Sequence, residues 1–302
     1  MSPSILRRRL PPLFAAMVGI SVLPYAASAE GRLPSACIVV EAAEGGSPII
    51  AARVNGRGPF GFVLDTGSSS TTLDELRTKQ LGLVPNPAPE QGQGMGGAVD
   101  VRVFRLHSVA TGSLVVRDLD VPGVAAPQIE GRDIAGLGGV DLFGSRLAVW
   151  RLERGCVQVR PSGARPGGRG WRRIESRWLK PWKILVPVRI GRAAGWGLLD
   201  TGSQRTILSP AFARLAGLRD GGGGGTVTGV DGRETALSAF VLPEATIGRW
   251  RFVHPTANVA NLPVFGRLGG ANEALAIVGM DWIGTRPFAI DYGRRQVWQA
   301  AR

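Results

Sequence analysis

The chain contains nearly the same segment twice, and this repeat constrains its fold more than any other feature. FVLDTGSSSTTL spans residues 62–73, and GLLDTGSQRTIL spans residues 197–208. A shift of 135 residues places Asp65 on Asp200 and keeps the surrounding residues in register without a gap. The shift grows to 140 further on, where GVDLFGSRLAVW aligns with GMDWIGTRPFAI. Internal repeats indicate one structural unit used more than once, so we expect two similar halves.

The repeat and the composition between its copies suggest where the parts of the chain begin and end. We predict an N-terminal lobe at residues 30–160 and a C-terminal lobe at residues 182–302. Residues 161–181, PSGARPGGRGWRRIESRWLKP, are rich in Gly, Pro and Arg and are predicted to form a basic linker whose tryptophans dock on a lobe.

Local patterns in each half predict mostly strands. PIIAARVNG and KILVPVRIG alternate apolar and polar residues up to a glycine, and a short apolar run then ends on the acid. One short helix is expected after each acid. The second helix has Ser209 as its N-cap, Pro210 at its first position and Gly217 as its stop. The predicted class is therefore all-β with a few short helices, arranged as two lobes.

The first 29 residues resemble a secretory signal peptide. Three arginines precede an apolar run from Leu13 to Leu23, and Ala27-Ser28-Ala29 follows. A membrane-spanning helix needs about 20 apolar residues, so we expect cleavage after Ala29; an uncleaved anchor is the alternative. The mature protein is then expected in a bacterial periplasm or outside the cell.

The inferred export determines how the two cysteines and the excess of basic residues are interpreted. In an oxidising compartment an even cysteine count favours a disulfide, so we predict a Cys37–Cys156 bridge, with two buried thiols as the alternative. The formal net charge is +13, and ten Lys or Arg lie between Arg151 and Lys183. This stretch is either a solvated connector or a surface for weak contact with anionic envelope material. Export argues against nucleic acid.

Each copy of the repeat places an acid, a hydroxyl and a glycine behind an apolar run. The apolar run carries the acid to the edge of a core, where loss of solvation raises its pKa. Glycine lets backbone N–H groups approach a carboxylate, and the hydroxyls are expected to fix its orientation. The residues predicted to support the acids are Thr66, Gly67, Ser68, Thr201, Gly202 and Ser203.

One such loop could be an ordinary turn, but two loops in equivalent halves favour a shared site. Pseudo-twofold packing brings equivalent points together, so Asp65 and Asp200 are expected to meet. Two acids about 3 Å apart cannot both ionise, and the pair then shares one proton. Such a pair can activate a water molecule and protonate a carbonyl oxygen.

With both motifs in place, the chain resembles the aspartic proteases. DTGSS and DTGSQ match the Asp-Thr-Gly-Ser/Thr signature of that family in both halves. The resemblance implies a bilobal pseudo-twofold fold and catalytic roles for Asp65 and Asp200, with a water nucleophile and no cofactor or metal. It also implies supporting segments at 277–279 and, with a poorer match, at 137–139. The expected protein is a monomeric endopeptidase acting on extended polypeptides.

Glycine-rich segments suggest a subtype. Pepsin-like enzymes usually carry a tyrosine in the flap, whereas the tyrosines here are Tyr25 and Tyr292. Instead, glycine-rich segments resemble the flap tips of retroviral-type proteases, which favours a bacterial retropepsin-like enzyme with two fused lobes. Plain surface turns are the alternative. The predicted flap residues are Gly94, Met95, Gly96, Gly97, Gly229, Val230, Asp231 and Gly232.

Other chemistries have little support in the sequence. GQGMGG at 92–97 follows a proline-rich stretch rather than a strand, which argues against a nucleotide site. The two histidines, His107 and His254, lack metal-ligand or triad spacing. The five glycines at 221–225 are predicted to form a flexible loop. A peptide-binding protein without catalysis, or a binding module that uses the basic linker, are the competing functions.

Overall fold

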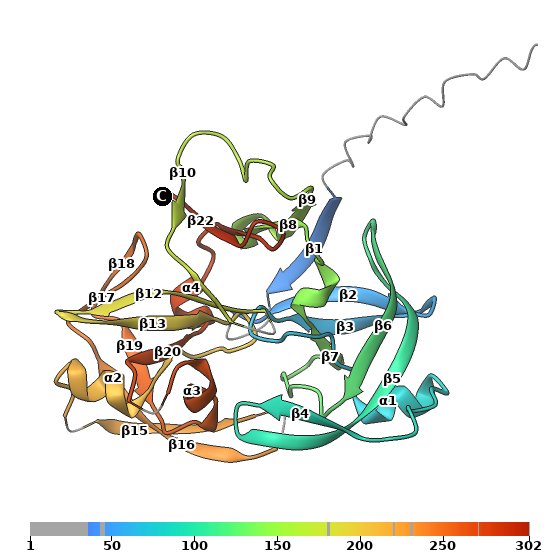
Figure 1. The fold of residues 1–302 in the computed structure, drawn as a ribbon, viewed down its shortest axis with the longest axis horizontal. Coiled ribbons are helices and arrows are strands. Elements are labelled where there is room, and N and C mark those ends of the chain that lie inside the picture. Colours follow the sequence, from blue (N-terminus) through green and yellow to red (C-terminus); the bar gives the residue numbers. More distant parts are fainter. Residues whose placement is uncertain are drawn as a thin grey trace, which may run out of the picture. The chain divides into compact units, whose positions relative to one another are not determined.

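The computed structural model describes residues 36–42, 46–179, 182–219, 221–229, 232–270 and 272–301. The predicted signal segment, residues 1–29, lies outside them. The described part is mostly β-structure with a few short helices, as predicted. Figure 1 shows these strands and helices coloured along the chain. None of the helices in the described residues is long and apolar enough to cross a membrane.

Among the described residues, the first half consists of strands with a short helix and 3-10 turns. Its elements are β1 (Ala36–Ala42), β2 (Pro48–Val54), β3 (Arg57–Leu64), α1 (Glu75–Gln80), β4 (Glu90–Gly94), β5 (Gly97–Thr111), β6 (Leu114–Gly123), β7 (Ile134–Gly138), η2 (Val140–Leu142), β8 (Leu147–Arg151), η3 (Leu152–Arg154) and β9 (Cys156–Arg160). 

The second half follows two short connecting strands and contains, like the first, a hairpin and then a short helix, together with additional short strands and further helices. The remaining elements are β10 (Trp171–Ile174), β11 (Arg177–Leu179), β12 (Lys183–Ile190), β13 (Ala193–Leu199), β14 (Ile207–Leu208), α2 (Pro210–Leu215), β15 (Gly222–Thr228), β16 (Glu234–Val241), β17 (Glu244–Ile247), β18 (Trp250–Val253), β19 (Thr256–Val259), α3 (Pro263–Leu268), β20 (Leu275–Val278), α4 (Met280–Ile283), β21 (Phe288–Asp291) and β22 (Gln296–Ala300). 

Each half places its acid with the same arrangement of strands. The predicted hairpins form, β2 with β3 and β12 with β13. The second strand of each hairpin then pairs in parallel with a later strand, β3 with β7 and β13 with β20. The predicted second helix also forms, because the Ser209 side chain accepts from the Phe212 N–H and Pro210 occupies the first turn.

The basic segment at 161–181 is more than a linker, because it contributes two strands. β10 pairs with β22, the last strand of the described chain, and β11 pairs with β12. Trp171 is buried against Leu147, Val149 and Ala289, which agrees with the predicted docking of a tryptophan. The composition predicted a connector, whereas residues 171–174 and 177–179 pair with neighbouring strands.

Strand pairing also crosses the boundary predicted between the halves. β21 pairs with β8 of the first half, so the end of the chain completes a sheet with the order β10-β22-β21-β8-β9-β1-β2-β3-β7. Figure 1 shows β21 and β22, in red, beside β8 and β9, in green. Stacked aromatic rings lie beneath this contact, with Trp150 and Phe288 centroids 5.2 Å apart. The two halves therefore share part of one core.

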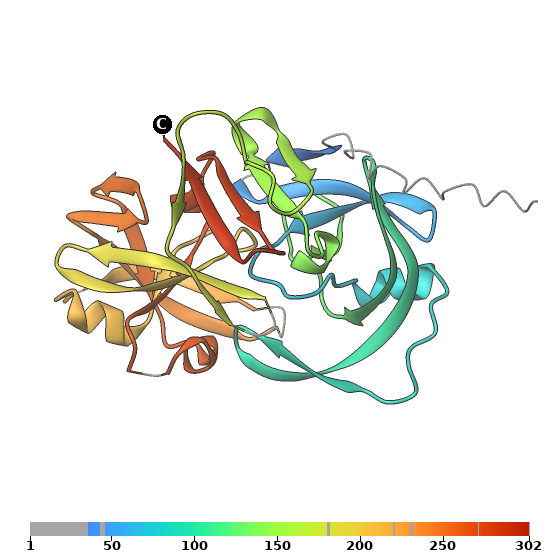
Figure 2. The ribbon, with the colours of Figure 1, turned by 45° about the horizontal axis from the view of Figure 1, so that its top comes forward.

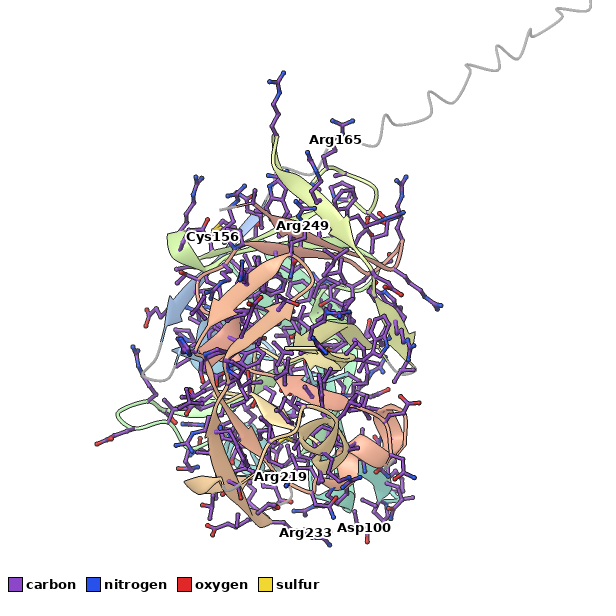
Figure 3. The ribbon with its side chains drawn as sticks, turned by 90° about the vertical axis from the view of Figure 1, so that its left-hand side faces the viewer. Asp100, Cys156, Arg165, Arg219, Arg233 and Arg249 are labelled. Atoms are coloured by element: carbon purple, nitrogen blue, oxygen red, sulfur yellow. A yellow bond between two sulfur atoms is a disulfide. The ribbon has the colours of Figure 1, made fainter. Side chains whose placement is uncertain are left out.

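The predicted disulfide is present. Cys37 of β1 and Cys156 of β9 are bonded, with their Cα atoms 5.7 Å apart. Cys156 is labelled in Figure 3. The bridge closes a sequence separation of 119 residues between two strands that also pair in the sheet. It therefore ties the start of the first half to its end.

The glycine run at 221–225 is not the flexible loop that was predicted. Gly222–Gly225 belong to β15, which pairs with β16. A Cβ on Gly224 would lie 2.9 Å from the Leu237 Cβ, and one on Gly221 would lie 2.4 Å from the Phe240 ring. The small residues thus allow close strand packing.

Candidate active site

The two acids lie at equivalent ends of buried strands. Asp65 follows β3 and Asp200 follows β13. The Asp65 N–H donates to the Gly138 carbonyl at 2.9 Å, and the Asp200 N–H donates to the Val278 carbonyl at 3.1 Å. These carbonyls belong to the predicted supporting segments at 137–139 and 277–279. Each segment thus fixes the backbone of the acid beside it.

Backbone amides, rather than hydroxyls, orient the carboxylates. The Gly67 and Ser68 N–H groups donate to Asp65 Oδ1 at 2.7 and 3.1 Å. Two amides of the second loop each donate to Asp200 Oδ1 at 3.0 Å. These two donors belong to Gly202 and Ser203.

The serine and threonine hydroxyls therefore do not act as predicted. The Ser68 hydroxyl donates to the Ser70 carbonyl at 2.8 Å, and the Ser203 hydroxyl donates to the Arg205 carbonyl at 2.9 Å. Each of these hydroxyls lies two residues before the carbonyl that it binds, and such a short-range hydrogen bond closes a local turn. These serines thus stabilise the loops.

The two threonines connect the halves. The Thr66 N–H donates to Thr201 Oγ1, and the Thr201 N–H donates to Thr66 Oγ1, both at 3.0 Å. Each hydroxyl then donates at 2.7 Å to a carbonyl of the opposite strand, at Leu199 and Leu64 respectively. All four bonds are buried. This reciprocal network holds the two Asp-Thr-Gly loops against each other.

The loops approach so closely that each carboxylate lies against the glycine of the other loop. A Cβ on Gly67 would lie 2.5 Å from Asp200 Cγ, and one on Gly202 would lie 2.4 Å from Asp65 Cγ. No side chain can occupy either position without displacing a carboxylate. The structure therefore brings Asp65 and Asp200 together and explains both glycines by steric contact.

Burial raises the pKa of both acids. Loss of solvation is the main cause for each, and the charge of Asp65 raises the pKa of Asp200 further. The nearby Lys183 ammonium opposes this and lowers the pKa of both carboxyls. A pair in which one acid keeps a proton while the other is ionised can act as acid and base together.

A second pair of acids, which we did not predict from the sequence, binds the segments that follow the two Asp-Thr-Gly loops. Asp141 accepts from the Thr71 N–H at 2.8 Å and from its hydroxyl at 2.7 Å. Asp281 binds Thr206 in the same way, at 2.9 and 2.7 Å. The aligned segments GVDLFG and GMDWIG each contain one of these acids at the same position, so the repeat could have identified the pair.

The first predicted flap is the tip of a hairpin. β4 and β5 pair up to Gly94 opposite Gly97, which leaves Met95 and Gly96 as a two-residue turn. GQGMGG therefore belongs to this hairpin. Figure 2 shows the β4–β5 hairpin, in teal, reaching toward the second half.

Three groups of the second half bind this tip. The Val264 N–H donates to the Met95 carbonyl at 3.2 Å. The Arg233 guanidinium donates to the Gly96 carbonyl at 2.9 Å, and Arg267 donates to the Gly94 carbonyl. Arg233 is labelled in Figure 3.

The second predicted flap lies between β15 and β16. The Gly229 N–H donates to the Arg233 carbonyl at 3.1 Å, and the Gly232 N–H donates to the Gly229 carbonyl at 2.9 Å. Val230 and Asp231 lie outside the described residues. The two glycine-rich tips thus meet through Arg233, although no spacing in the sequence indicated this contact.

The described residues contain no group of three or more His, Cys, Asp or Glu that could hold a metal ion. His107 and His254 are both exposed.

Comparison with known families agrees with this geometry. The family model described as aspartyl protease matches the chain twice, at residues 50–142 and 186–282. The chain belongs to the aspartyl protease family. A search of curated proteins found no match. Each matched region begins in the first strand of the hairpin that leads to an Asp-Thr-Gly loop and ends just after the supporting segment, so this aspartyl protease carries two copies of the family unit.

Proposed function

We propose that the protein is an exported aspartic endopeptidase of the retropepsin-like type, with both halves of the dyad in one chain. One observation carries the proposal, namely the meeting of the Asp65 and Asp200 loops. Each carboxylate touches the glycine of the other loop, and the two threonines bind across the boundary. Family membership supports a protease in general.

The dyad suits hydrolysis by a water molecule. An ionised carboxylate takes a proton from water while the protonated partner gives its proton to the oxygen of the peptide carbonyl. The fixed backbone donors keep both groups oriented throughout, which lowers the reorganisation needed in the transition state. No covalent intermediate is required. The hairpin tip at 94–97 would cover an extended polypeptide bound above the acids.

Cleavage of an unstructured polypeptide tests the dyad. Wild-type protein should cleave it, and Asp65→Asn and Asp200→Asn should each lose at least about 100-fold in rate. Asp118→Asn is the matched control, because Asp118 is exposed on β6 and should leave the rate unchanged. Full activity in either dyad variant would refute the mechanism. Binding of the polypeptide without cleavage by the wild type would favour the peptide-binding alternative.

Export is tested by the N-terminus of the mature chain. The full sequence expressed in a bacterial host should yield a periplasmic protein beginning at Glu30. Periplasmic or membrane-exposed proteins are then its proposed substrates. A full-length chain held in the membrane fraction would favour the uncleaved anchor, and cytoplasmic protein would refute export.

Weak contact with anionic envelope material is the proposed role of the basic segment. Arg165, labelled in Figure 3, is exposed, as are Arg169, Arg172 and Arg173. Arg165→Gln combined with Arg169→Gln should weaken binding to vesicles containing an anionic lipid, more so at low salt. The control variant replaces Arg189 and Arg214, both exposed, by Gln. Equal loss in both variants would show that net charge alone is responsible.

A further inference from the structure

A single lysine breaks the symmetry of the candidate active site. Lys183 is the first residue of β12. At the shift of 135 its equivalent in the first half is Pro48, whose side chain has no hydrogen-bond donor. The halves therefore give the two acids different electrostatic surroundings, although the Asp-Thr-Gly loops themselves are alike.

The lysine binds the loop that holds Asp65. Its ammonium donates to the Gly67 carbonyl oxygen. That carbonyl belongs to the peptide unit between Gly67 and Ser68, and the N–H of the same unit donates to Asp65 Oδ1 at 3.1 Å. The peptide thus lies between the cation and one carboxylate. Gly67 also touches the other carboxylate, since a Cβ there would lie 2.5 Å from Asp200 Cγ.

A cation on a carbonyl oxygen strengthens the N–H of the same peptide as a donor. Hydrogen bonds in series polarise one another, and bonds to charged groups are the strongest. The bond from Ser68 to Asp65 therefore favours the ionised form of Asp65. The corresponding bond from Ser203 to Asp200, at 3.0 Å, has no lysine behind it, because Pro48 stands in that place.

We propose that Lys183 is a positioning residue of the dyad, which acts through the Gly67–Ser68 peptide to keep Asp65 ionised and to leave the shared proton on Asp200. This assignment rests on the proposed peptidase function. Asp65 then takes a proton as an O–H bond of water breaks, and the hydroxyl oxygen bonds to the carbonyl carbon. The carbonyl oxygen receives the proton of Asp200, which becomes the ionised partner.

The charged groups around the dyad determine the sign of the expected pH effect. Lys183 faces both carboxylates. Burial lowers the pKa of its ammonium most, and the Arg267 cation of α3 lowers it further, whereas the two carboxylates raise it. Tyr292, after β21, stays neutral, because burial and the charge of Asp65 raise its pKa. A cation stabilises ionised carboxylates and so lowers both pKa values of the pair. Removal of the lysine's charge must therefore move both the acidic and the alkaline limb of the profile of kcat/KM against pH to higher pH.

The test compares profiles of kcat/KM against pH for five proteins, the wild type and four variants. Lys183→Met should move both limbs upward by about one pH unit, the lower end of the effect expected from a nearby opposite charge. Lys183→Gln keeps a donor without the charge and should behave like Lys183→Met, whereas Lys183→Arg should restore the wild-type limbs. Arg189→Met is the matched control, since it removes a charge from an exposed position on the same strand.

Unchanged limbs in folded Lys183→Met would overturn the assignment. Loss of activity at every pH with unmoved limbs would also overturn it, because a merely structural lysine gives that result. If the wild type cleaves nothing, the proposed function fails instead. In that case the titration of Asp65 and Asp200 is measured by ¹³C NMR of their carboxyl carbons. A titration shifted upward in Lys183→Met supports the assignment, and an unshifted one overturns it.

Discussion

Two carboxyl groups that share a proton are costly to bury, and Asp65 and Asp200 are buried together where the two halves meet. Backbone amides offset part of that cost by donating two hydrogen bonds to each acid. The remaining cost appears as a raised pKa in both groups. At the scale of single residues, the raised pKa values mean that burial of these two acids costs stability at neutral pH.

Removing one acid should stabilise the fold at neutral pH while it abolishes cleavage. The folded pKa of Asp200 lies well above the ordinary value of 3.8, so the folded state binds more protons than the unfolded state above that pH. Stability from this group therefore falls as pH rises. Asp200→Asn should be more stable than wild type at pH 7, and less so toward pH 4, in urea unfolding. Equal stability of the two proteins at both pH values would contradict the raised pKa.

The glycine beside each acid should tolerate no side chain. In Gly202→Ala the new Cβ would lie 2.4 Å from Asp65 Cγ and push that carboxylate aside. A displacement of about 1 Å typically costs about 100-fold in rate, which is the loss expected in kcat/KM. Gly168→Ala is the control, because a Cβ there meets nothing within 4 Å. Wild-type activity in Gly202→Ala would show that the loops can separate.

At the scale of elements, the β4–β5 hairpin is held to the second half by its backbone. Its tip offers three carbonyl groups, and α3 and the β15–β16 connection supply the donors. Met95 is partly buried and packs against the core of the second half. A hairpin bound by a few hydrogen bonds and one side chain can open without disturbing either half, as a cover over a substrate site must do.

Loss of one of these bonds should loosen the tip selectively. Arg267→Ala removes the donor to the Gly94 carbonyl. A single hydrogen bond is worth about 0.5 to 1.5 kcal/mol, so amides of the tip should exchange with deuterium about threefold to tenfold faster. Arg214→Ala on α2 is the control, since Arg214 is exposed. Equal exchange in wild type and Arg267→Ala would mean that packing of Met95 alone holds the tip.

For the described part of the chain as a whole, the two halves are joined by hydrogen bonds that cross between them. The threonine network lies at the dyad, and the pairing of β21 with β8 joins the halves again at a second place. Burial of the aromatic rings beneath that sheet adds apolar contact to both halves. Alignment of the active site therefore depends on contacts made by the complete chain.

Breaking the threonine network should destabilise this whole assembly. Thr201→Val leaves the Thr66 N–H and the Leu64 carbonyl buried without their partner. Each such group costs about 1 to 3 kcal/mol, so the free energy of unfolding should fall by about 2 to 6 kcal/mol, with a loss of activity. Thr246→Val on β17 is the control and should change stability by less than about 1 kcal/mol. A similar small change in Thr201→Val would show that water replaces the lost bonds.

Much of the site was predictable because it is repeated. An internal repeat appears in the sequence, so the paired acids and their glycines followed from one alignment. Local alternation predicted the two hairpins, and the resemblance to aspartic proteases implied the supporting segments at 137–139 and 277–279. The disulfide followed from the cysteine count and the inferred export. The signal peptide, the extended substrate and the periplasmic location stay predictions.

The features that break the repeat were decided by the tertiary structure alone. Nothing local indicated that Lys183 would reach the loop of the other half, or that Arg233 and Arg267 would bind the hairpin tip. The two strands within 161–181 had the composition of a linker, because their strand character depends on partners, β22 and β12, that no local pattern reveals. The sequence by itself determined two equivalent acids in two similar halves. The long-range contacts made them unequal, since a cation can approach one loop only after the chain has brought the halves together.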